Sequence, residues 1–121
     1  MDTMKTLRQL QDSLGVTRRA MQGYEQEGLV GPTGRNKYGH LLYDEAAQER
    51  IARIRLYQQL GFRRKEIAEL LDAPGQAVKT ALEECIMRME KDQIQQAFLM
   101  EQAKALLADI NMKLHNQGHG G

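Results

Sequence analysis

Apolar residues recur at helical spacing through most of the chain, in short blocks at first and in one long block at the end. Three leucines on one face of residues 7–14 predict the first helix. Thr6 and Gln9 can form a capping box at its start, and Gly15 suits the left-handed position at its end. The chain therefore opens with one short amphipathic helix that has clear limits.

A second short helix is predicted after a tight turn. Thr17 is its expected N-cap, and Gly28 follows its end at about Glu27. Its inward stripe is short and consists of Ala20, Met21 and Tyr24. Two short helices joined in this way are typical of a helix-turn-helix.

The helical period disappears between Val30 and Tyr43, where glycines and a proline punctuate the chain. Residues 34–43 predict a small hairpin with the sequence KYGH near its tip. Asp44 is then expected to cap a helix that Gly61 closes. The inward side of this helix is predicted to hold Ile51, Ile54, Leu56 and Leu60.

The sequence DAPG at residues 72–75 predicts a linker between two parts of the chain. A fourth short helix is expected before it, at 64–71, and one long helix after it, at 76–116, where there is no Pro or Gly. Such a helix is about 60 Å long, more than a domain of this size can cover, so it needs a partner. A second copy of the chain is the simplest one. We expect the first domain over 1–71 and a flexible tail over 117–121.

One broad face of the long helix carries the apolar residues expected to pair with that copy. The predicted dimerisation residues are Leu82, Ile86, Met89, Met100, Leu107, Ile110 and Leu114, with Val78, Ala97 and Ala103 beside them. Gln93 and Gln96 interrupt this face, where polar side chains can fix the register at some cost in stability. The pattern leaves parallel and antiparallel pairing open.

A second apolar strip lies away from the first and consists of Met87, Ile94, Phe98 and Met112. A two-stranded coiled coil does not require it. It either packs on the N-terminal domain of the second copy or forms a surface for a small molecule or protein, for which Met and Phe are suitable.

Composition limits the classes of protein that fit. The 121 residues include a single cysteine, so no disulfide can form within the chain. No stretch approaches the length of a membrane span and the start lacks a signal-peptide core, which predicts a soluble cytoplasmic protein. The net charge of +1 hides a modest asymmetry, because the excess of basic residues lies before residue 72.

Three stretches, in order, resemble the MerR family of bacterial transcription regulators: GVTRRAMQGYEQEGL at 15–29, GRNKYGHLLYDE at 34–45 and LGFRRKEIAELL at 60–71. The resemblance implies a mainly α fold, a winged helix-turn-helix DNA-binding domain followed by a long dimerisation helix in an antiparallel coiled coil. It implies a homodimer on an inverted-repeat operator in double-stranded promoter DNA, acting by distortion of the promoter spacer. RNA polymerase and an unidentified small-molecule effector are further implied partners, and no cofactor is expected.

The second helix is the expected recognition helix. Arg18 and Arg19 lie in its first turn, where positive charge interacts slightly unfavourably with the helix dipole. DNA phosphates close to this end of the helix would explain the placement. The alternative is that the two arginines belong to a solvated helix end. Gln22 shares their exposed face and can pair with an adenine edge. Thr17 is a further predicted DNA contact. Tyr24 is expected to place its ring in the core and its hydroxyl at a phosphate.

Two further groups of hydrogen-bond donors are candidates for contacts to the DNA backbone. The alternative is a polar turn for the first group and ordinary protein surface for the second. The hairpin supplies Arg35, Asn36, Lys37, Tyr38 and His40, and the start of the fourth helix supplies Arg63, Arg64 and Lys65.

The sequence departs from the family pattern at several positions. The paired tyrosines of the family become Gly23 and Tyr24, Leu41 replaces a common phosphate-binding arginine of the wing, and Arg63 replaces a capping serine. These departures favour the alternative function, a helical dimeric interaction protein with the same scaffold but weak or lost DNA binding.

Other chemistry has little support in the sequence. We expect no metal site; the one arrangement to consider joins Cys85 to His115 and His119 of a second, antiparallel copy, but a lone Cys among apolar residues is usually a core residue. Redox sensing by Cys85 rests only on Arg88 one turn away. No nucleophile with a base, phosphate loop or paired carboxylates is present, so an enzyme is not expected.

Overall fold

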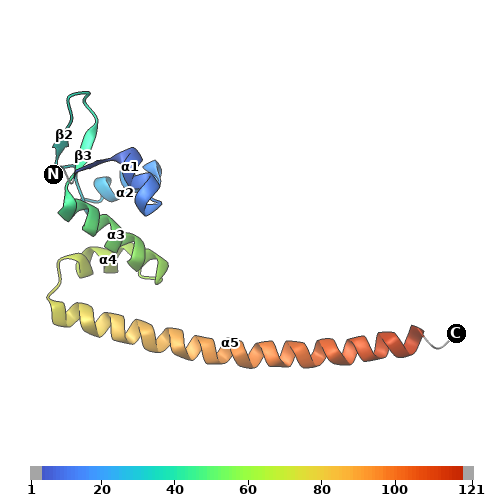
Figure 1. Cartoon of the computed structure of the whole chain (residues 1–121). Coiled ribbons are helices and arrows are strands. Elements are labelled where there is room, and N and C mark those ends of the chain that lie inside the picture. Colours follow the sequence, from blue (N-terminus) through green and yellow to red (C-terminus); the bar gives the residue numbers. More distant parts are fainter. Residues whose placement is uncertain (1–3, 119–121) are drawn as a thin grey trace. The chain divides into compact units, whose positions relative to one another are not determined.

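The computed structural model describes residues 4–118, which divide into two units, one ending at Gly75 and one beginning at Gln76 (Figure 1). The elements in chain order are β1 (Lys5–Thr6), α1 (Leu7–Leu14), α2 (Arg18–Gln26), β2 (Gly34–Arg35), β3 (Leu41–Tyr43), α3 (Glu45–Gln59), α4 (Arg64–Leu71) and α5 (Gly75–Gly118). The mainly α fold predicted from the sequence is confirmed.

Side-chain caps delimit the first two helices, as predicted. The Thr6 hydroxyl accepts the Gln9 N–H at 3.3 Å, and the Gln9 side chain accepts the Thr6 N–H at 2.8 Å, which completes the capping box. Gly15 then ends α1 with φ at +67°, in the left-handed region where only glycine is free of strain. The turn is short because α2 starts three residues later, at Arg18.

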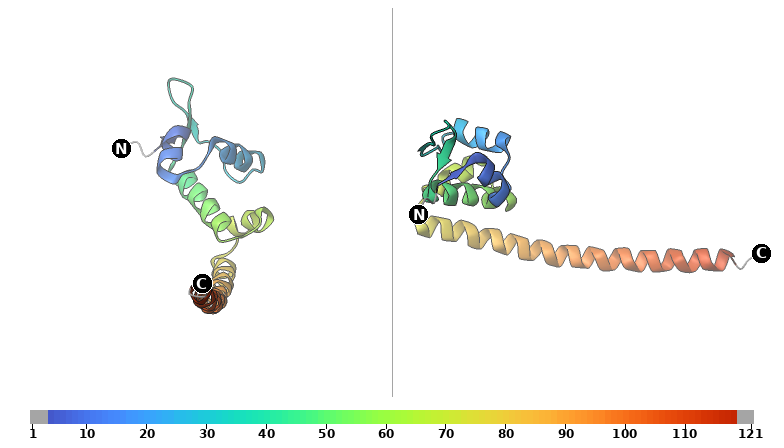
Figure 2. Two further views of the ribbon diagram at one scale, coloured as in Figure 1. Left: turned by 90° about the vertical axis from the view of Figure 1, so that its right-hand side faces the viewer. Right: turned by 45° about the horizontal axis from the view of Figure 1, so that its top comes forward.

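A small antiparallel sheet joins the start of the chain to the hairpin. The strand order is β1-β3-β2, with Thr6 opposite Leu42 and Arg35 opposite Leu41. The hairpin of β2 and β3 projects from the helices as the predicted wing (Figure 2). Strand β1 was missed because two residues directly before a helix cap carry no alternation that a sequence pattern can show.

Helices α3 and α4 pack together and complete the core of the first unit. Ile51, Ile54 and Ile67 are all 1% exposed or less, as their spacing predicts. The prediction for Leu56 is wrong, since it is 49% exposed and Tyr57 is buried in its place. The edge of the Phe62 ring packs against the Tyr57 ring, with centroids 5.7 Å apart, so the aromatic pair takes the inward position.

Helix α5 runs without interruption over 44 residues and leaves most of its apolar side chains in contact with solvent. Ile86, Met100 and Leu107 are each more than half exposed. None of the described helices combines the length and the apolar character that crossing a membrane requires. Exposed apolar surface of this extent is typical of an interaction site.

Candidate nucleic-acid interface

Helix α2 has one face in the core and one face in solvent. Met21 is 1% exposed, whereas Arg18, Arg19 and Gln22 are exposed. The Thr17 hydroxyl accepts the Ala20 N–H at 3.0 Å, so this side chain serves as the N-cap. The structure therefore brings three of the predicted contact residues to one solvent-facing stretch at the start of α2.

The Tyr24 ring belongs to the core, as expected, but its hydroxyl bonds within the protein and does not face outward toward a phosphate. The side chain is 2% exposed, and the hydroxyl donates to the Gln58 amide oxygen at 2.8 Å. Burial raises the pKa of this hydroxyl, against the smaller lowering effects of Arg55 and Arg64. Tyr24 thus ties α2 to α3, and its phosphate role is corrected to that of a positioning residue.

A second tyrosine ties the wing to α2. The hydroxyl of Tyr43, at the end of β3, donates to the carboxylate of Glu25. Burial and, after it, this hydrogen bond raise the pKa of Tyr43. Glu25 was missed because a carboxylate on a polar helix gives no sequence signal for a partner 18 residues away.

The turn of the wing uses two of the predicted contact residues to hold its own shape. The Asn36 amide oxygen accepts the backbone N–H groups of Tyr38 and His40, at 2.9 and 3.0 Å. The Arg35 guanidinium donates to the Gly39 carbonyl at 2.7 Å. Lys37 lies 5.1 Å from the centre of the Tyr38 ring, and both are exposed at the tip. The tip therefore presents a cation and a phenol on a turn fixed from within.

The start of α4 lies beside the end of α2. Arg64 forms an ion pair with Glu27, and its guanidinium nitrogens lie 3.8 and 3.9 Å from where a Cβ on Gly23 would stand. Gly23 thus leaves room for the Arg64 guanidinium where the family resemblance predicts a tyrosine. Arg63 caps α4 without a side-chain bond, and Glu66 compensates by accepting the Arg63 N–H at 3.0 Å. Arg63, Arg64 and Lys65 are all exposed.

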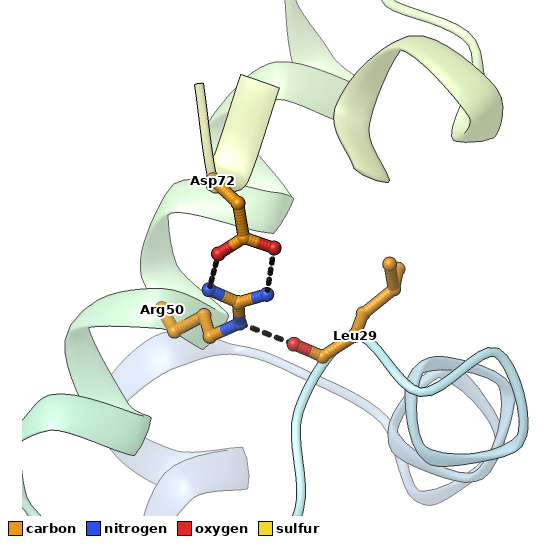
Figure 3. A network of polar contacts seen from close by, with 3 residues as sticks. All are labelled: Leu29, Arg50 and Asp72. Carbon is orange, nitrogen blue, oxygen red and sulfur yellow. Dashed lines mark hydrogen bonds and ion pairs between the residues drawn. The ribbon is translucent and has the colours of Figure 1, made fainter. Parts of the chain in front are cut away.

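Arg50 on α3 joins three segments of the first unit (Figure 3). Its Nε donates to the carbonyl of Leu29, just after α2, and its two terminal nitrogens bind the Asp72 carboxylate at 3.0 and 3.3 Å. The hydrogen bond and the charge of Arg50 lower the pKa of Asp72. This node connects the segment that follows α2 to the end of α4, and no sequence pattern indicates it.

The described part of the chain contains no cluster of side chains that could hold a metal ion. No three side chains among the His, Cys, Asp and Glu residues of 4–118 are grouped as a metal would require. Cys85 is buried, with its sulfur 4.0 Å from that of Met89, and His119 lies outside the described residues. The expectation of no metal site therefore stays a prediction, with the cross-subunit arrangement of Cys85, His115 and His119 as its alternative.

A short helix, a tight turn, an exposed second helix and a wing define a helix-turn-helix of the winged class. Residues 5–74 match the family described as MerR HTH family regulatory protein. The chain belongs to this family, which confirms the resemblance seen in its sequence.

Individual relatives agree with the family. The HTH-type transcriptional activator TipA of Streptomyces coelicolor is 41% identical over 61 residues, half of this chain and 24% of TipA. The HTH-type transcriptional activator mta of Bacillus subtilis is 34% identical over 77 residues, 64% of this chain and 30% of mta. The chain thus matches less than a third of the length of each. Neither is described as an enzyme.

Solved structures extend the likeness beyond the helix-turn-helix. MtaN, the N-terminal part of the multidrug transporter activator of Bacillus subtilis, is 27% identical with a TM-score of 0.64, covering 85% of this chain and 97% of MtaN. HiNmlR, a MerR family regulator lacking the sensor domain and bound to promoter DNA, is 19% identical with a TM-score of 0.59, covering 81% and 76%. The second likeness concerns the fold alone.

Proposed function

We propose that the chain regulates transcription by binding promoter DNA as a homodimer on an inverted-repeat operator. The exposed face of α2 carries this proposal: Arg18, Arg19 and Gln22 point outward from a helix whose other face is fixed in the core. Arginine recognises guanine and glutamine recognises adenine through two hydrogen bonds in the major groove. A helix anchored in this way can present such donors to base edges in a constant orientation.

The wing and the start of α4 supply contacts to phosphates in this proposal. Lys37 and Tyr38 are exposed on a turn that Asn36 and Arg35 hold from within. Arg64 and Lys65 stand at a helix N-terminus, where free N–H groups also attract anions. Contacts of this kind fix the register on the duplex and carry no base sequence.

The long helix supplies the second subunit in this proposal. Its exposed apolar face needs cover, and an identical helix provides it without a further protein. In this proposal residues 1–71 bind DNA, residues 72–75 link the two parts of the chain, and residues 76–116 form the dimer. The two long helices pair antiparallel, as the family resemblance suggests. Distortion of the promoter spacer, contact with RNA polymerase and a response to a small effector follow from the same resemblance and belong to the proposal. The cytoplasmic location expected from the sequence belongs to it as well.

The test is fluorescence anisotropy on fragments of the promoters near the gene, over a range of salt concentrations. We expect tight binding to one fragment and a logarithmic salt slope of about 0.9 for each phosphate neutralised. Arg19→Ala should change the preference among sequences, whereas Arg64→Ala should weaken all sequences alike. Lys113→Ala, on α5, is the control that should change neither.

A second function has one observation in its favour. Leu41 in β3 stands where the family resemblance predicts a phosphate-binding arginine, which fits a dimeric interaction protein that no longer binds DNA tightly. For such a protein, anisotropy would show no sequence preference and a slope near zero. That result, with a dimer still seen by sedimentation, would replace the regulator by this alternative.

A further inference from the structure

The wing carries basic side chains and no carboxylate. Arg35, Lys37 and His40 stand within six consecutive residues, and the acidic residues that flank them in the sequence are Glu27 and Asp44. The wing therefore offers no internal partner for a positive charge, and an anion must come from outside. His40 is the member of the three whose residue type changes its charge near neutral pH.

The turn fixes the backbone of His40 and leaves its ring accessible. The His40 N–H donates to the Asn36 amide oxygen at 3.0 Å, and the His40 carbonyl accepts the Asn36 N–H at 2.9 Å. The ring is exposed, with its centroid 6.4 Å from that of the Tyr38 ring. Within residues 4–118 no group forms a hydrogen bond with the imidazole nitrogens. Both nitrogens are therefore available to an outside acceptor.

We propose that His40 takes up a proton when the wing meets a DNA phosphate, so that a fall in pH strengthens DNA binding. The inference rests on the proposed function and adds a regulation of the same surface. A protonated imidazole donates from both nitrogens and carries a charge, whereas a neutral one has a single donor and no charge. Leu41, the next residue, adds no permanent charge to the wing, so the proton on His40 decides how strongly this segment holds a phosphate.

The charged groups around the wing give a protonated His40 no partner. Arg35 on β2 donates to the Gly39 carbonyl at 2.7 Å, and Lys37 lies 5.1 Å from the centre of the Tyr38 ring. Lys5 on β1, opposite the far end of β3, is a further cation. None of these groups can neutralise a charged imidazole, whereas a phosphate can.

The carboxylates near β3 are engaged at its other end. Glu25 accepts the Tyr43 hydroxyl, and Asp44 accepts the Ala47 N–H at 2.8 Å as the cap of α3. Both groups lie where β3 ends, whereas His40 directly precedes its start. In the proposed complex, a phosphate of the DNA backbone is therefore the anion that fits His40.

Proton uptake on binding fixes the direction of the pH effect. The complex holds more protons than the free protein and the free DNA, so affinity increases as the pH falls. The increase takes place in the range in which histidine titrates, between about pH 5 and 8, and is complete below it. A dimer has two wings, so the effect of one histidine on affinity enters twice.

Fluorescence anisotropy at constant ionic strength measures the effect, on the promoter fragment that the chain binds most tightly. We expect the wild-type dissociation constant to fall roughly sixfold to 25-fold from about pH 7.5 to about pH 5.5. The logarithmic salt slope should be steeper at the lower pH by up to about 0.9 for each wing, because a charged His40 neutralises one more phosphate.

Two variants of the exposed ring separate charge from shape. His40→Gln keeps a neutral donor, so it should bind about as tightly as the wild type at the higher pH and lose the gain at the lower pH. His40→Arg keeps a charge at every pH, so it should bind tightly at both with one salt slope. His115→Gln, in the last turn of α5, is the matched control, which removes another histidine and should keep the full pH dependence.

The remaining outcomes separate this inference from the proposed function. A wild-type dissociation constant that does not change with pH, or a His40→Gln variant that keeps the pH dependence, overturns the proton uptake. Sequence preference and a salt slope would then leave the proposed regulator intact. Binding without sequence preference and with a slope near zero overturns both.

Nuclear magnetic resonance of the imidazole protons gives an independent measurement on the full chain. The midpoint of the His40 titration should move to higher pH when the promoter fragment is added, because the complex favours the charged ring. The His115 titration should keep its midpoint. A His40 midpoint that stays in place would contradict the proton uptake, whatever the affinity.

Discussion

The two units of this chain bury their apolar residues in opposite ways. Within residues 4–118, eleven of the twelve buried apolar residues lie before residue 72, whereas twelve of the fifteen exposed large apolar residues lie on α5. The first unit has a core of its own, while α5 leaves most of its apolar side chains exposed and presents one half of an interface in the proposed dimer. Cys85 is the single member of α5 in the buried group. The difference teaches that the same kind of residue stabilises the fold in one unit and selects a partner in the other.

The largest expected effect comes from the core of the first unit. Ile54→Ala, at a side chain with 0% exposure, should lower the free energy of unfolding by roughly 2–5 kcal/mol because a cavity replaces packed atoms. Leu107→Ala, at a side chain 58% exposed, should lower dimer affinity and leave the stability of the first unit unchanged. Urea titration of both variants, with sedimentation for the dimer, measures the contrast. Equal effects on the first unit would break the comparison.

A smaller effect is expected at the Arg50 node. Arg50→Ala should lower the free energy of unfolding by roughly 1–2 kcal/mol, since the Asp72 carboxylate and the Leu29 carbonyl both lose a charged donor. Arg53→Ala, on the exposed side of the same helix, is the control and should change stability little. If Arg50 only positions the DNA-binding segments, DNA affinity falls while the salt slope stays constant. A slope reduced by about one unit would instead indicate a direct phosphate contact.

Gly23 offers a gain in stability. A Cβ there would make ordinary contacts with the Arg64 guanidinium, at 3.8 Å, and its backbone is helical. Gly23→Ala should therefore raise the free energy of unfolding by roughly 0.5–1 kcal/mol, because alanine loses less backbone entropy in a helix. Thermal unfolding measures it. Gly23→Tyr is the contrasting variant, which should displace Arg64 and weaken DNA binding; a Tyr variant with unchanged affinity would argue against the role given to Arg64.

The smallest expected effect is a dependence of the free energy of unfolding on pH in the acid range. The pKa of Asp72 is lower in the folded chain than its usual value, so the unfolded state binds a proton more readily. Its contribution to stability is complete above the unfolded pKa of about 3.9 and disappears as the pH falls through the lower folded pKa. Asp72→Asn should lose stability at pH 7 and show a flatter acid limb in urea titrations from pH 7 to pH 2. An unchanged acid limb would show that other carboxylates dominate it.

Local signals made most of the fold predictable. Thr6, Thr17 and Asp44 all cap helices where their sequence context predicts, because a cap depends on residues three positions away. The hairpin was also predictable, since its glycines and Asn36 act within the turn itself. Structure that depends on neighbours in sequence can be read from one sequence.

Tertiary partners account for what was missed. The spacing of α3 allowed either Leu56 or Tyr57 on the inward side, and the Phe62 ring decides between them from beyond the end of the helix. The hydroxyl of Tyr24 donates a hydrogen bond to Gln58, 34 residues away. The glycine at position 23 is explained by the Arg64 guanidinium beside it. These pairings depend on the packing of α2 against later helices, which no local pattern encodes.

In its ion pair with Arg64, the Glu27 carboxylate competes with DNA phosphates for this arginine. A phosphate that binds Arg64 must take it from a carboxylate already in place, so the contact contributes less net free energy than one from an arginine that is merely hydrated. The cost of this exchange is the same on every DNA sequence, and an operator that also engages Arg18, Arg19 and Gln22 can offset it. The carboxylate of Glu27 therefore keeps the affinity for random DNA low, and its removal should tighten binding to all sequences by a similar factor.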